Sequence, residues 1–369
     1  MAAPLTLLKH ADRLAGQLIA SLLPRPVLRE MQGFPKSLLI IRPGGIGDAV
    51  LLVPALQTLQ VRFPGVSIDI LAERRNAGVF SLCPALRSVR RYDIPSEFFE
   101  ALRSRYDVVI DSEQWHRLSA VVARILRAEI RIGFDTNDRR RLFTHPIPYE
   151  QDDYEADSFM RLLAPLGCAA EEEGGGPLLS FSTRDAEAAG CHLKRLEGRP
   201  IVTLFPGASI AERRWGAERF VRLAQLLGRR GVGVVVVGGE GELADGRTIE
   251  TIGGISLCGL TNLAETAAVI ARSSLLVSGD SGILHIAVGL GVPTVSLFGP
   301  GRAMKWAPRG ENHIVINKNL PCSPCTTFGY TPRCPINARC MTEITVDEVE
   351  EAVLTLLSRK NFDGHQQKP

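Results

Sequence analysis

Residues 274–298 read SLLVSGDSGILHIAVGLGVPTVSLF. The apolar run 274–278 predicts a buried strand, and the glycines and polar residues of 279–282 predict a turn. The apolar stretch that follows predicts a helix, and the run 294–298 predicts a second strand. A strand, a helix and a second strand in this order are typical of a βαβ unit, which places both strands parallel in one sheet.

The same alternation extends through the chain in two series. The strand-like runs lie at residues 37–42, 67–72, 89–92 and 107–111 in the first series, and at 201–205, 232–237, 255–257, 274–278 and 294–298 in the second. Between the series, EEEGGGP at 171–177 has the composition of a linker. We therefore predict an α/β protein with two Rossmann-like, doubly wound domains, whose ligands bind beyond the carboxyl ends of the strands.

These patterns predict four segments. They are an N-terminal amphipathic helical extension at 1–30, a Rossmann-like domain at 31–175, a second one at 176–345, and a C-terminal helix and tail at 346–369. In the extension, apolar residues recur at helical spacing, while Lys9, His10 and Arg13 form the polar side and interrupt any signal-peptide core. The helix either docks on its own domain or lies on an anionic membrane.

Composition excludes some partners. The 369 residues are 45% hydrophobic and 22% charged, as in globular proteins, and a net charge of +3 gives no argument for nucleic acid. Residues 1–150 hold 21 Lys and Arg against 15 Asp and Glu, whereas 151–369 hold 22 against 25, so the first half is expected to face an anionic partner. The longest uncharged run, 281–301, carries five glycines and two prolines and is expected to be buried rather than membrane-spanning.

The turn at 279–282 has the chemistry of an anion site. Gly279 and Gly282 let backbone amides approach a ligand closely, and a helix start presents free amides and a positive dipole end. Ser281 adds a hydroxyl, and His285 lies one turn into the helix. Asp280 or Ser281 also suits a helix cap, but a cap alone accounts for neither His285 nor the paired glycines. We expect a phosphate here.

Three further glycine-rich loops follow strands of the second domain. PGAS at 206–209 leads to Arg213, GGEGE at 238–242 carries two glutamates, and GPG occupies 299–301. Arg213 has the charge to neutralise a diphosphate, and an acidic residue can bond a ribose diol. The four loops together predict a nucleoside diphosphate site. The chain contains neither a P-loop nor a complete G-x-G-x-x-G fingerprint.

In the first domain, PGGIGD at 43–48 joins a predicted strand to a predicted helix. Asp48 then lies at or near the start of the helix. It is either a plain cap or a carboxylate that faces the phosphate site across a cleft between the domains. In the second case it can take a proton from an attacking hydroxyl.

Four cysteines cluster near the C-terminus. Cys322-x-x-Cys325 has the spacing of a metal site, but Cys334 and Cys340 do not repeat it. A bound metal, a reversible disulfide and packed thiols remain open, and we expect no metal or other cofactor in catalysis.

Several segments resemble glycosyltransferase family 9, which contains the ADP-heptose–lipopolysaccharide heptosyltransferases. They are LLIIRPGGIGDAVLLVPAL, LFPGASIAERRW, VVVVGGEGE, LLVSGDSGILHIAVGLGVPTVSLFGP and the cysteine segment beginning CSPC, which follow one another in the family's order over about residues 37–345. The resemblance implies a GT-B fold, with the active site between two Rossmann-like domains and the closing helix packed back on the first domain. It also implies an inverting, metal-independent transfer from a nucleotide sugar, usually ADP-L-glycero-D-manno-heptose, to the lipopolysaccharide core.

The resemblance also implies roles for residues. Asp48 matches the general base, within an acceptor-side loop that includes Gly45 and Gly47. The residues that match donor-binding positions are Ser209, Arg213, Glu240 or Glu242, Thr261, Asp280, Ser281, Gly282 and His285. The implied location is the cytoplasm, with peripheral contact to the inner membrane, where a lipid-linked acceptor lies.

Two other functions fit the same motifs. A nucleotide-sugar epimerase of the GT-B fold would process its sugar nucleotide without an acceptor. A non-catalytic nucleotide-sugar-binding protein would bind nucleotide and lose nothing when Asp48 is replaced by asparagine.

Overall fold

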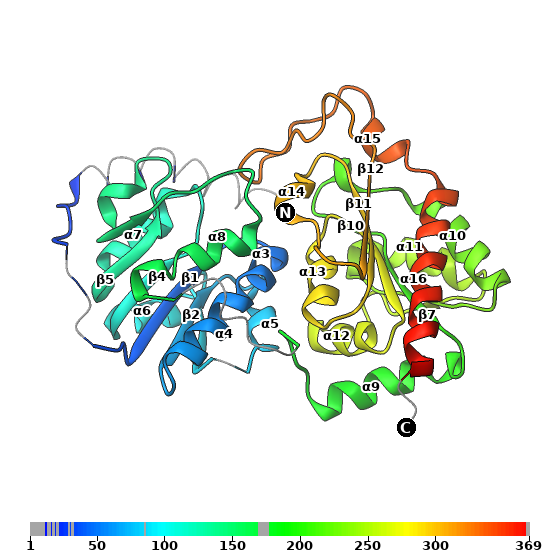
Figure 1. Ribbon diagram of the computed structural model, residues 1–369, viewed down its shortest axis with the longest axis horizontal. Coiled ribbons are helices and arrows are strands. Elements are labelled where there is room, and N and C mark those ends of the chain that lie inside the picture. Colours follow the sequence, from blue (N-terminus) through cyan, green and yellow to red (C-terminus); the bar gives the residue numbers. More distant parts are fainter. Residues whose placement is uncertain are drawn as a thin grey trace. The chain divides into compact units, whose positions relative to one another are not determined.

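The computed structural model describes residues 12, 16, 19, 22–28, 30, 33–84, 86–168 and 177–366, with side chains described as far as Arg359. The chain divides into two compact units, Met1–Gly176 and Pro177–Pro369. Within the described ranges each unit has one six-stranded sheet with helices around it (Figure 1). The predicted fold class of two doubly wound α/β domains is therefore confirmed.

The first sheet has the strand order β3-β2-β1-β4-β5-β6, and every adjacent pair is parallel. Its strands are β1 (Ser37–Arg42), β2 (Ser67–Ala72), β3 (Ser88–Arg91), β4 (Arg105–Asp111), β5 (Arg127–Phe134) and β6 (His145–Ile147). The order reverses at β1, which pairs with β2 on one side and β4 on the other. Ligands of such sheets bind where the order reverses.

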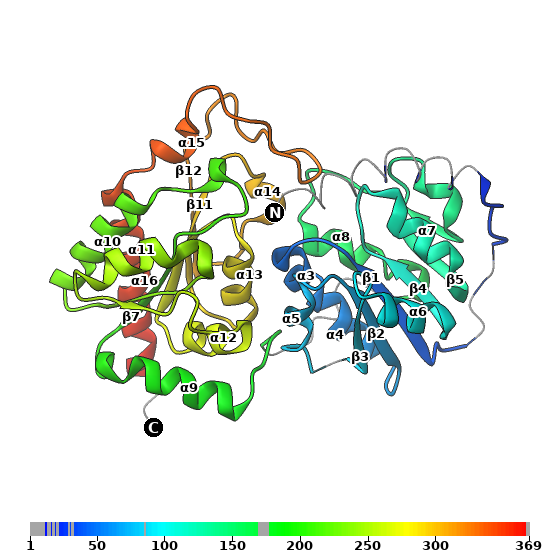
Figure 2. The same cartoon turned by 180° about the vertical axis from the view of Figure 1, so that it is seen from behind.

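Helices cover both faces of this sheet. α6 and α7 share a core cluster with β1 and β4, while α3, α4 and α8 pack on one another at the opposite face (Figures 1 and 2). The helical segments are α3 (Ile46–Leu51), α4 (Val53–Arg62), α5 (Ala77–Phe80), α6 (Pro95–Arg103), α7 (Arg117–Ile125), η2 (Arg139–Leu142), α8 (Glu155–Arg161) and η3 (Ala164–Leu166).

Most of the predicted N-terminal helix lies outside the described residues. The part that is described contacts α7. Asp12 is buried and accepts a hydrogen bond of 2.7 Å from the Leu118 amide, and Arg124 donates to the Pro24 carbonyl. These contacts attach the described residues of the extension to the first unit.

The second sheet has the strand order β12-β11-β10-β7-β8-β9 and is parallel throughout. Its strands are β7 (Ile201–Phe205), β8 (Gly233–Val236), β9 (Ile255–Ser256), β10 (Leu275–Gly279), β11 (Thr294–Phe298) and β12 (His313–Asn317). Here the order reverses at β7, which pairs with β8 and β10. The loops after β7 and β10 therefore meet at the reversal.

Helices of the second unit also form two layers. α10, α11 and α16 share one core cluster with the sheet, and α9 and α12 share another (Figures 1 and 2). The helical segments are α9 (Thr183–Leu193), η4 (Lys194–Leu196), η5 (Ala211–Arg213), α10 (Ala217–Arg229), η6 (Glu240–Glu242), α11 (Leu243–Glu250), α12 (Leu263–Ala271), α13 (Gly282–Gly289), α14 (Ala303–Trp306), α15 (Arg339–Thr342) and α16 (Val346–Gln366).

The closing helix α16 differs from expectation. Its apolar residues Val349, Val353 and Leu356 belong to the core cluster of the second unit, beside α10. The expectation was a helix packed back on the first domain. Burial of this apolar stripe against the second sheet is the physical reason for the difference.

No described helix is long and apolar enough to cross a bilayer. The uncharged run 281–301 instead forms α13 and β11, and it is largely buried between the layers of the second unit.

Candidate active site

The reversal point of the first sheet carries a buried arginine. Arg42 ends β1, and only 1% of its side chain is exposed. Its Nε donates to the Pro43 carbonyl at 2.6 Å, and its Nη1 donates to the Ser112 carbonyl, beyond the end of β4, at 2.8 Å. The Phe159 ring lies 5.4 Å from the guanidinium carbon. The guanidinium therefore links the ends of the two central strands.

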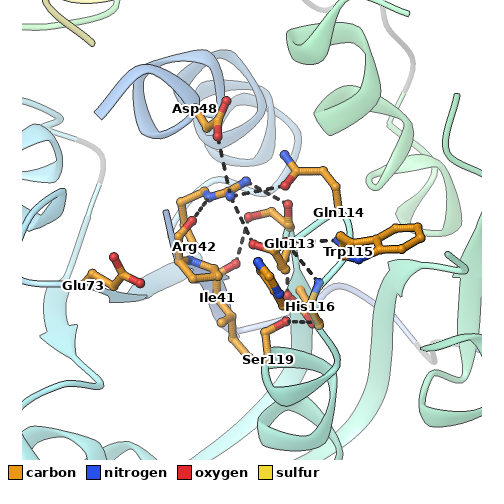
Figure 3. Close-up of polar contacts among 12 residues, drawn as sticks. Ile41, Arg42, Asp48, Glu73, Glu113, Gln114, Trp115, His116 and Ser119 are labelled. Atoms are coloured by element: carbon orange, nitrogen blue, oxygen red, sulfur yellow. Dashed lines mark hydrogen bonds and ion pairs between the residues drawn. The ribbon is translucent and has the colours of Figure 1, made fainter. Parts of the chain in front are cut away.

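Three side chains converge on the remaining nitrogen, Arg42 Nη2 (Figure 3). Glu113 Oε2 lies 3.6 Å away, Gln114 Oε1 lies 3.5 Å away, and Asp48 Oδ2 lies 3.9 Å away. Glu113 and Gln114 follow β4, whereas Asp48 follows β1. The parallel pairing of β1 and β4 brings these groups together.

Asp48 occupies the third position of α3, whereas Gly45 is the cap residue. The plain helix-cap interpretation is therefore wrong. The Asp48 side chain is 28% exposed, unlike Glu113 at 8%. A partly exposed carboxylate beside a buried cation can meet a ligand that the other charged groups of the cluster cannot reach.

The glycines of this loop have different roles. Gly44 has a φ of +108°, and a Cβ there would lie 3.1 Å from Arg42 Nη2, so both backbone and space require glycine. Gly45 is extended with φ −80°, and Gly47 is the second residue of α3. Gly44 is therefore the glycine whose backbone lies closest to the Arg42 guanidinium, and the sequence alone did not distinguish it from Gly45 and Gly47.

Behind Arg42 lies a second buried ion pair. Arg139 Nη2 contacts Asp111 Oδ2 at 2.7 Å, and both side chains are fully buried. Burial opposes ionisation of Glu113, but the charges of Arg42, His116 and Arg139 outweigh it, so the pKa of Glu113 lies below its ordinary value. Glu113 is therefore an anion that partly neutralises Arg42.

A chain of hydrogen bonds that centres on the Glu155 carboxylate completes the cluster. Tyr149 donates to Glu155 Oε2 at 2.9 Å, and Gln114 donates to Glu155 Oε1. Burial and the carboxylates of Glu155 and Asp48 raise the pKa of the Tyr149 phenol, so it stays a donor. Gln114 therefore donates to Glu155 while its oxygen faces Arg42.

The reversal point of the second sheet carries another ion pair. Arg213 ends η5, in the loop after β7, and its Nη1 lies 3.1 Å from Oδ2 of Asp280, which follows β10. The two side chains are 16% and 8% exposed. A Cβ at Gly279 would lie 3.1 Å from the Arg213 carbonyl, and one at Gly301 would overlap Asp280 Oδ2. The two glycines leave room for the pair.

The α13 start is organised by serine. Ser281 is the cap: its Oγ accepts from the Leu284 amide at 3.3 Å and lies 2.8 Å from Ser278 Oγ. Gly282 is the first residue of the helix. His285 lies on the buried side of α13 and is only 3% exposed. An anion at this helix start would therefore meet the backbone amides and the Ser281 hydroxyl rather than the buried His285 imidazole.

The two glutamates of the loop 238–242, Glu240 and Glu242, have different surroundings. Glu242 Oε2 accepts from the Gly239 amide at 3.0 Å, and its Oε1 lies 3.8 Å from Arg214 Nη2. A Cβ at Gly207 or Gly238 would collide with this side chain, so Glu242 fills the space between two loops. Glu240 is exposed. Glu242 orders the loops, and Glu240 is the one available to a ligand.

The remaining donor-side residues lie at the same edge of the sheet. Ser209 is exposed in the loop after β7. Thr261 follows β9, and its Oγ1 lies 2.8 Å from Thr266 Oγ1, which fixes the turn before α12. The exposed Leu260 side chain precedes it.

The cysteine segment gathers around the end of β11. Cys340 is buried beside Gly299, and the Cys325 amide donates to the Pro300 carbonyl. Burial and the neighbouring cysteines raise the pKa of the Cys325 and Cys340 thiols. All eight cysteines lie in the described ranges and are free thiols, and no metal-binding group of three His, Cys, Asp or Glu occurs there. Of the four clustered cysteines, Cys340 is buried, Cys325 and Cys334 are half-buried, and Cys322 is exposed.

Sequence reasoning missed Arg42, Glu113 and Gln114. The available signals were a charged residue at the end of an apolar strand and the polar run DSEQ at 111–114 after the next central strand. Both stand at carboxyl ends of strands, where ligands of parallel sheets bind.

Comparison with known proteins identifies relatives over most of the chain. Residues 96–331 match the family model described as glycosyltransferase family 9 (heptosyltransferase). Lipopolysaccharide heptosyltransferase 3 of Escherichia coli is 26% identical over 73% of this chain and 85% of its own length, and lipopolysaccharide heptosyltransferase 1 of Pseudomonas aeruginosa is 25% identical over 80% and 88%. The solved structure of Escherichia coli ADP-heptose lps heptosyltransferase II has the same fold, with a TM-score of 0.71 at 23% identity over 88% of this chain and 99% of that one.

Proposed function

Because the chain belongs to glycosyltransferase family 9, we propose that it transfers heptose from ADP-heptose to an oligosaccharide of the lipopolysaccharide core, with Asp48 as general base. The names of the relatives support this donor and acceptor. The observation that carries the proposal is the ion-paired cluster at each sheet's reversal point. One contains a partly exposed carboxylate, and the other contains an arginine beside a helix start.

The second unit is proposed to hold the donor. The α13 start offers amides and Ser281 to the diphosphate, and Arg213 offers a cation. Asp280 repels phosphate, so its proposed part is to orient Arg213 rather than to bind the donor itself. Exposed Glu240 is the proposed ribose ligand, and the turn at Leu260 and Thr261 the proposed adenine contact.

The first unit is proposed to hold the acceptor. An acceptor hydroxyl attacks the anomeric carbon and gives its proton to Asp48, a new C–O bond forms, and the bond to the diphosphate breaks, which releases ADP with inversion. Charge that develops on the departing diphosphate is stabilised by Arg213 and the α13 amides, and each such fixed donor is worth roughly 3 kcal/mol. The basic first half of the chain suits an anionic acceptor.

The proposed location is the cytoplasm, with peripheral contact to the inner face of the membrane. A lipid-linked acceptor would be found there. Among the described residues of the extension, Leu22, Val27 and Leu28 are largely exposed, as a segment that touches lipid requires.

The test is transfer by the Asp48→Asn variant. Replacement should lower transfer from ADP-heptose to core acceptors by roughly a hundredfold to ten-thousandfold, with ADP affinity unchanged because Asp48 is in the first unit. The matched control is Glu129→Gln, which removes an exposed carboxylate of the same unit. Transfer near the wild-type rate by Asp48→Asn would remove Asp48 from the base role.

Ligand-dependent melting separates the alternatives. A stabilising shift with ADP but not with UDP or GDP supports an ADP-sugar donor, and a ligand at about 100 times its dissociation constant adds roughly 2.7 kcal/mol. Turnover of the sugar nucleotide without acceptor would favour an epimerase. ADP binding with no turnover under any condition would favour a non-catalytic binding protein.

A further inference from the structure

Arg42 is a buried cation whose position is fixed by backbone. Burying a guanidinium is costly unless its N–H groups are bonded and its charge is paired. Two of its nitrogens donate to main-chain carbonyls at 2.6 and 2.8 Å, one from each central strand end. Asn76 lies in the loop after β2, and its side-chain Nδ2 donates to the Arg42 carbonyl at 3.0 Å. The guanidinium therefore cannot follow a mobile partner.

Its third nitrogen lies between two carboxylates of unequal freedom. Glu113 is held: its Oε1 accepts from the amides of Trp115 and His116 at 3.0 and 3.2 Å, while its Oε2 faces Arg42. Asp48 is more exposed and reaches Arg42 through Oδ2 alone. A fixed cation beside a more exposed carboxylate limits where that carboxylate rests.

We propose that Arg42 is the positioning residue for Asp48, and that Glu113 is the buried counter-ion that sets how much of the Arg42 charge Asp48 experiences. The proposal rests on the proposed function, because it assigns work to Asp48 as a base. Arg42 touches no reacting atom in this scheme. It acts through the carboxylate that does.

Arg42 and Tyr149 interact with Asp48 directly, and Glu113 and Glu155 are in turn the partners of these two residues. Arg42 ends β1, Glu113 follows β4, Tyr149 follows β6, and Glu155 is on α8. Tyr149 is protonated and bound to Glu155, and Arg139 neutralises Asp111 behind Glu113. The Arg42–Glu113 pair is therefore the pair of charges whose removal should affect Asp48 most.

Opposite shifts follow from removing the two partners. In Arg42→Gln, Asp48 loses its neighbouring cation and remains near the Glu113 anion, so less positive potential acts on it. The acidic limb of the kcat/KM profile should move to higher pH by about one unit, and the rate should recover in part above that limb. In Glu113→Gln, the amide oxygen still accepts from the two backbone amides while Arg42 acts on Asp48 alone, so the limb should move to lower pH.

The experiment compares pH profiles of transfer for the two variants with that of Arg90→Gln. Arg90 is a matched control because it forms an ion pair of 2.7 Å with buried Asp69 in the same unit, and none of its contacts involves Asp48. Its removal should lower the melting temperature and leave the limb in place. ADP affinity should stay unchanged in all three variants.

The melting temperatures and pH profiles of these variants distinguish a structural role of Arg42 from a positioning role. A lower melting temperature for Arg42→Gln with an unmoved limb would overturn the proposal, as would a limb that rises in Glu113→Gln. If Arg42→Gln does not fold, the direction of the Glu113→Gln shift alone decides. Failure of the proposed function looks different: wild-type protein would transfer nothing, or Asp48→Asn would remain active.

Discussion

Replacement of Gly301 by alanine tests the ion pair at the reversal point of the second sheet. A Cβ at Gly301 would overlap Asp280 Oδ2 and lie 3.1 Å from its Cγ. Asp280 is 7% exposed and paired with Arg213 at 3.1 Å, so the carboxylate has to move and the pair opens. The Gly301 backbone is outside the left-handed region, so the clash is the only cost.

The size of the effect follows from packing and pairing. Overpacking costs typically about 1–3 kcal/mol, and a disturbed, mostly buried ion pair adds to it. We expect the second unit to lose roughly 2–3 kcal/mol of unfolding free energy, which corresponds to a fall of roughly 4–12 °C in Tm for a domain of this size. ADP affinity should fall as well, because Arg213 loses the carboxylate that orients it.

The control is the same substitution at Gly228, in α10 of the same unit. Nothing lies within 4 Å of a Cβ there, so alanine should raise the unfolding free energy by roughly 0.5–1 kcal/mol. Thermal unfolding would be followed by the fluorescence of Trp215 and Trp306 in a Trp115→Phe background, which confines the signal to the second unit. A wild-type Tm for Gly301→Ala would refute the reasoning.

Three further predictions concern stability. Arg139→Met leaves the Asp111 charge buried and should cost the first unit roughly 3–5 kcal/mol, whereas the double variant with Asp111→Leu should recover most of it in urea unfolding; no recovery would contradict the pairing. Burial opposes ionisation of Asp69, but hydrogen bonds from two arginines lower its pKa from 3.8 to about 2, so its contribution is present above pH 3.8 and lost as the pH falls toward about 2. Asp69→Asn should flatten the Tm profile in that window, and an unchanged slope would count against it. Asn262→Ala removes the α12 cap and should cost roughly 1 kcal/mol by thermal unfolding, a loss that Thr248→Ala, with a single local bond, should not share.

Much of the fold was predictable because buried parallel strands are short apolar runs bounded by glycine. The runs at 37–42 and 67–72 coincide with β1 and β2, and 294–298 coincides with β11. The prediction missed β5, β6 and β12. β5 reads RAEIRIGF, in which charged residues alternate with apolar ones, and the edge strands β6 and β12 are mostly half-buried.

The candidate site divides in the same way. Asp48, Arg213 and the 279–282 loop were found from local signals, since each combines a glycine turn, a strand end and a helix start. The partners were not. Nothing in the sequence relates Arg42 to Glu113, and the donor-side assignment of Asp280 gave no hint that it pairs with Arg213.

The sequence by itself determined the two doubly wound domains, the family and the loops that carry chemistry, because these depend on hydrophobic period, glycine positions and residue order. Only the tertiary structure decided which charges meet. Backbone pairing sets Ile41 opposite Asp111 and Ser278 opposite Phe205, and this register brings together side chains that lie about 70 residues apart in the chain. A charge contact of this kind depends on three-dimensional distance, which no local pattern of residues encodes.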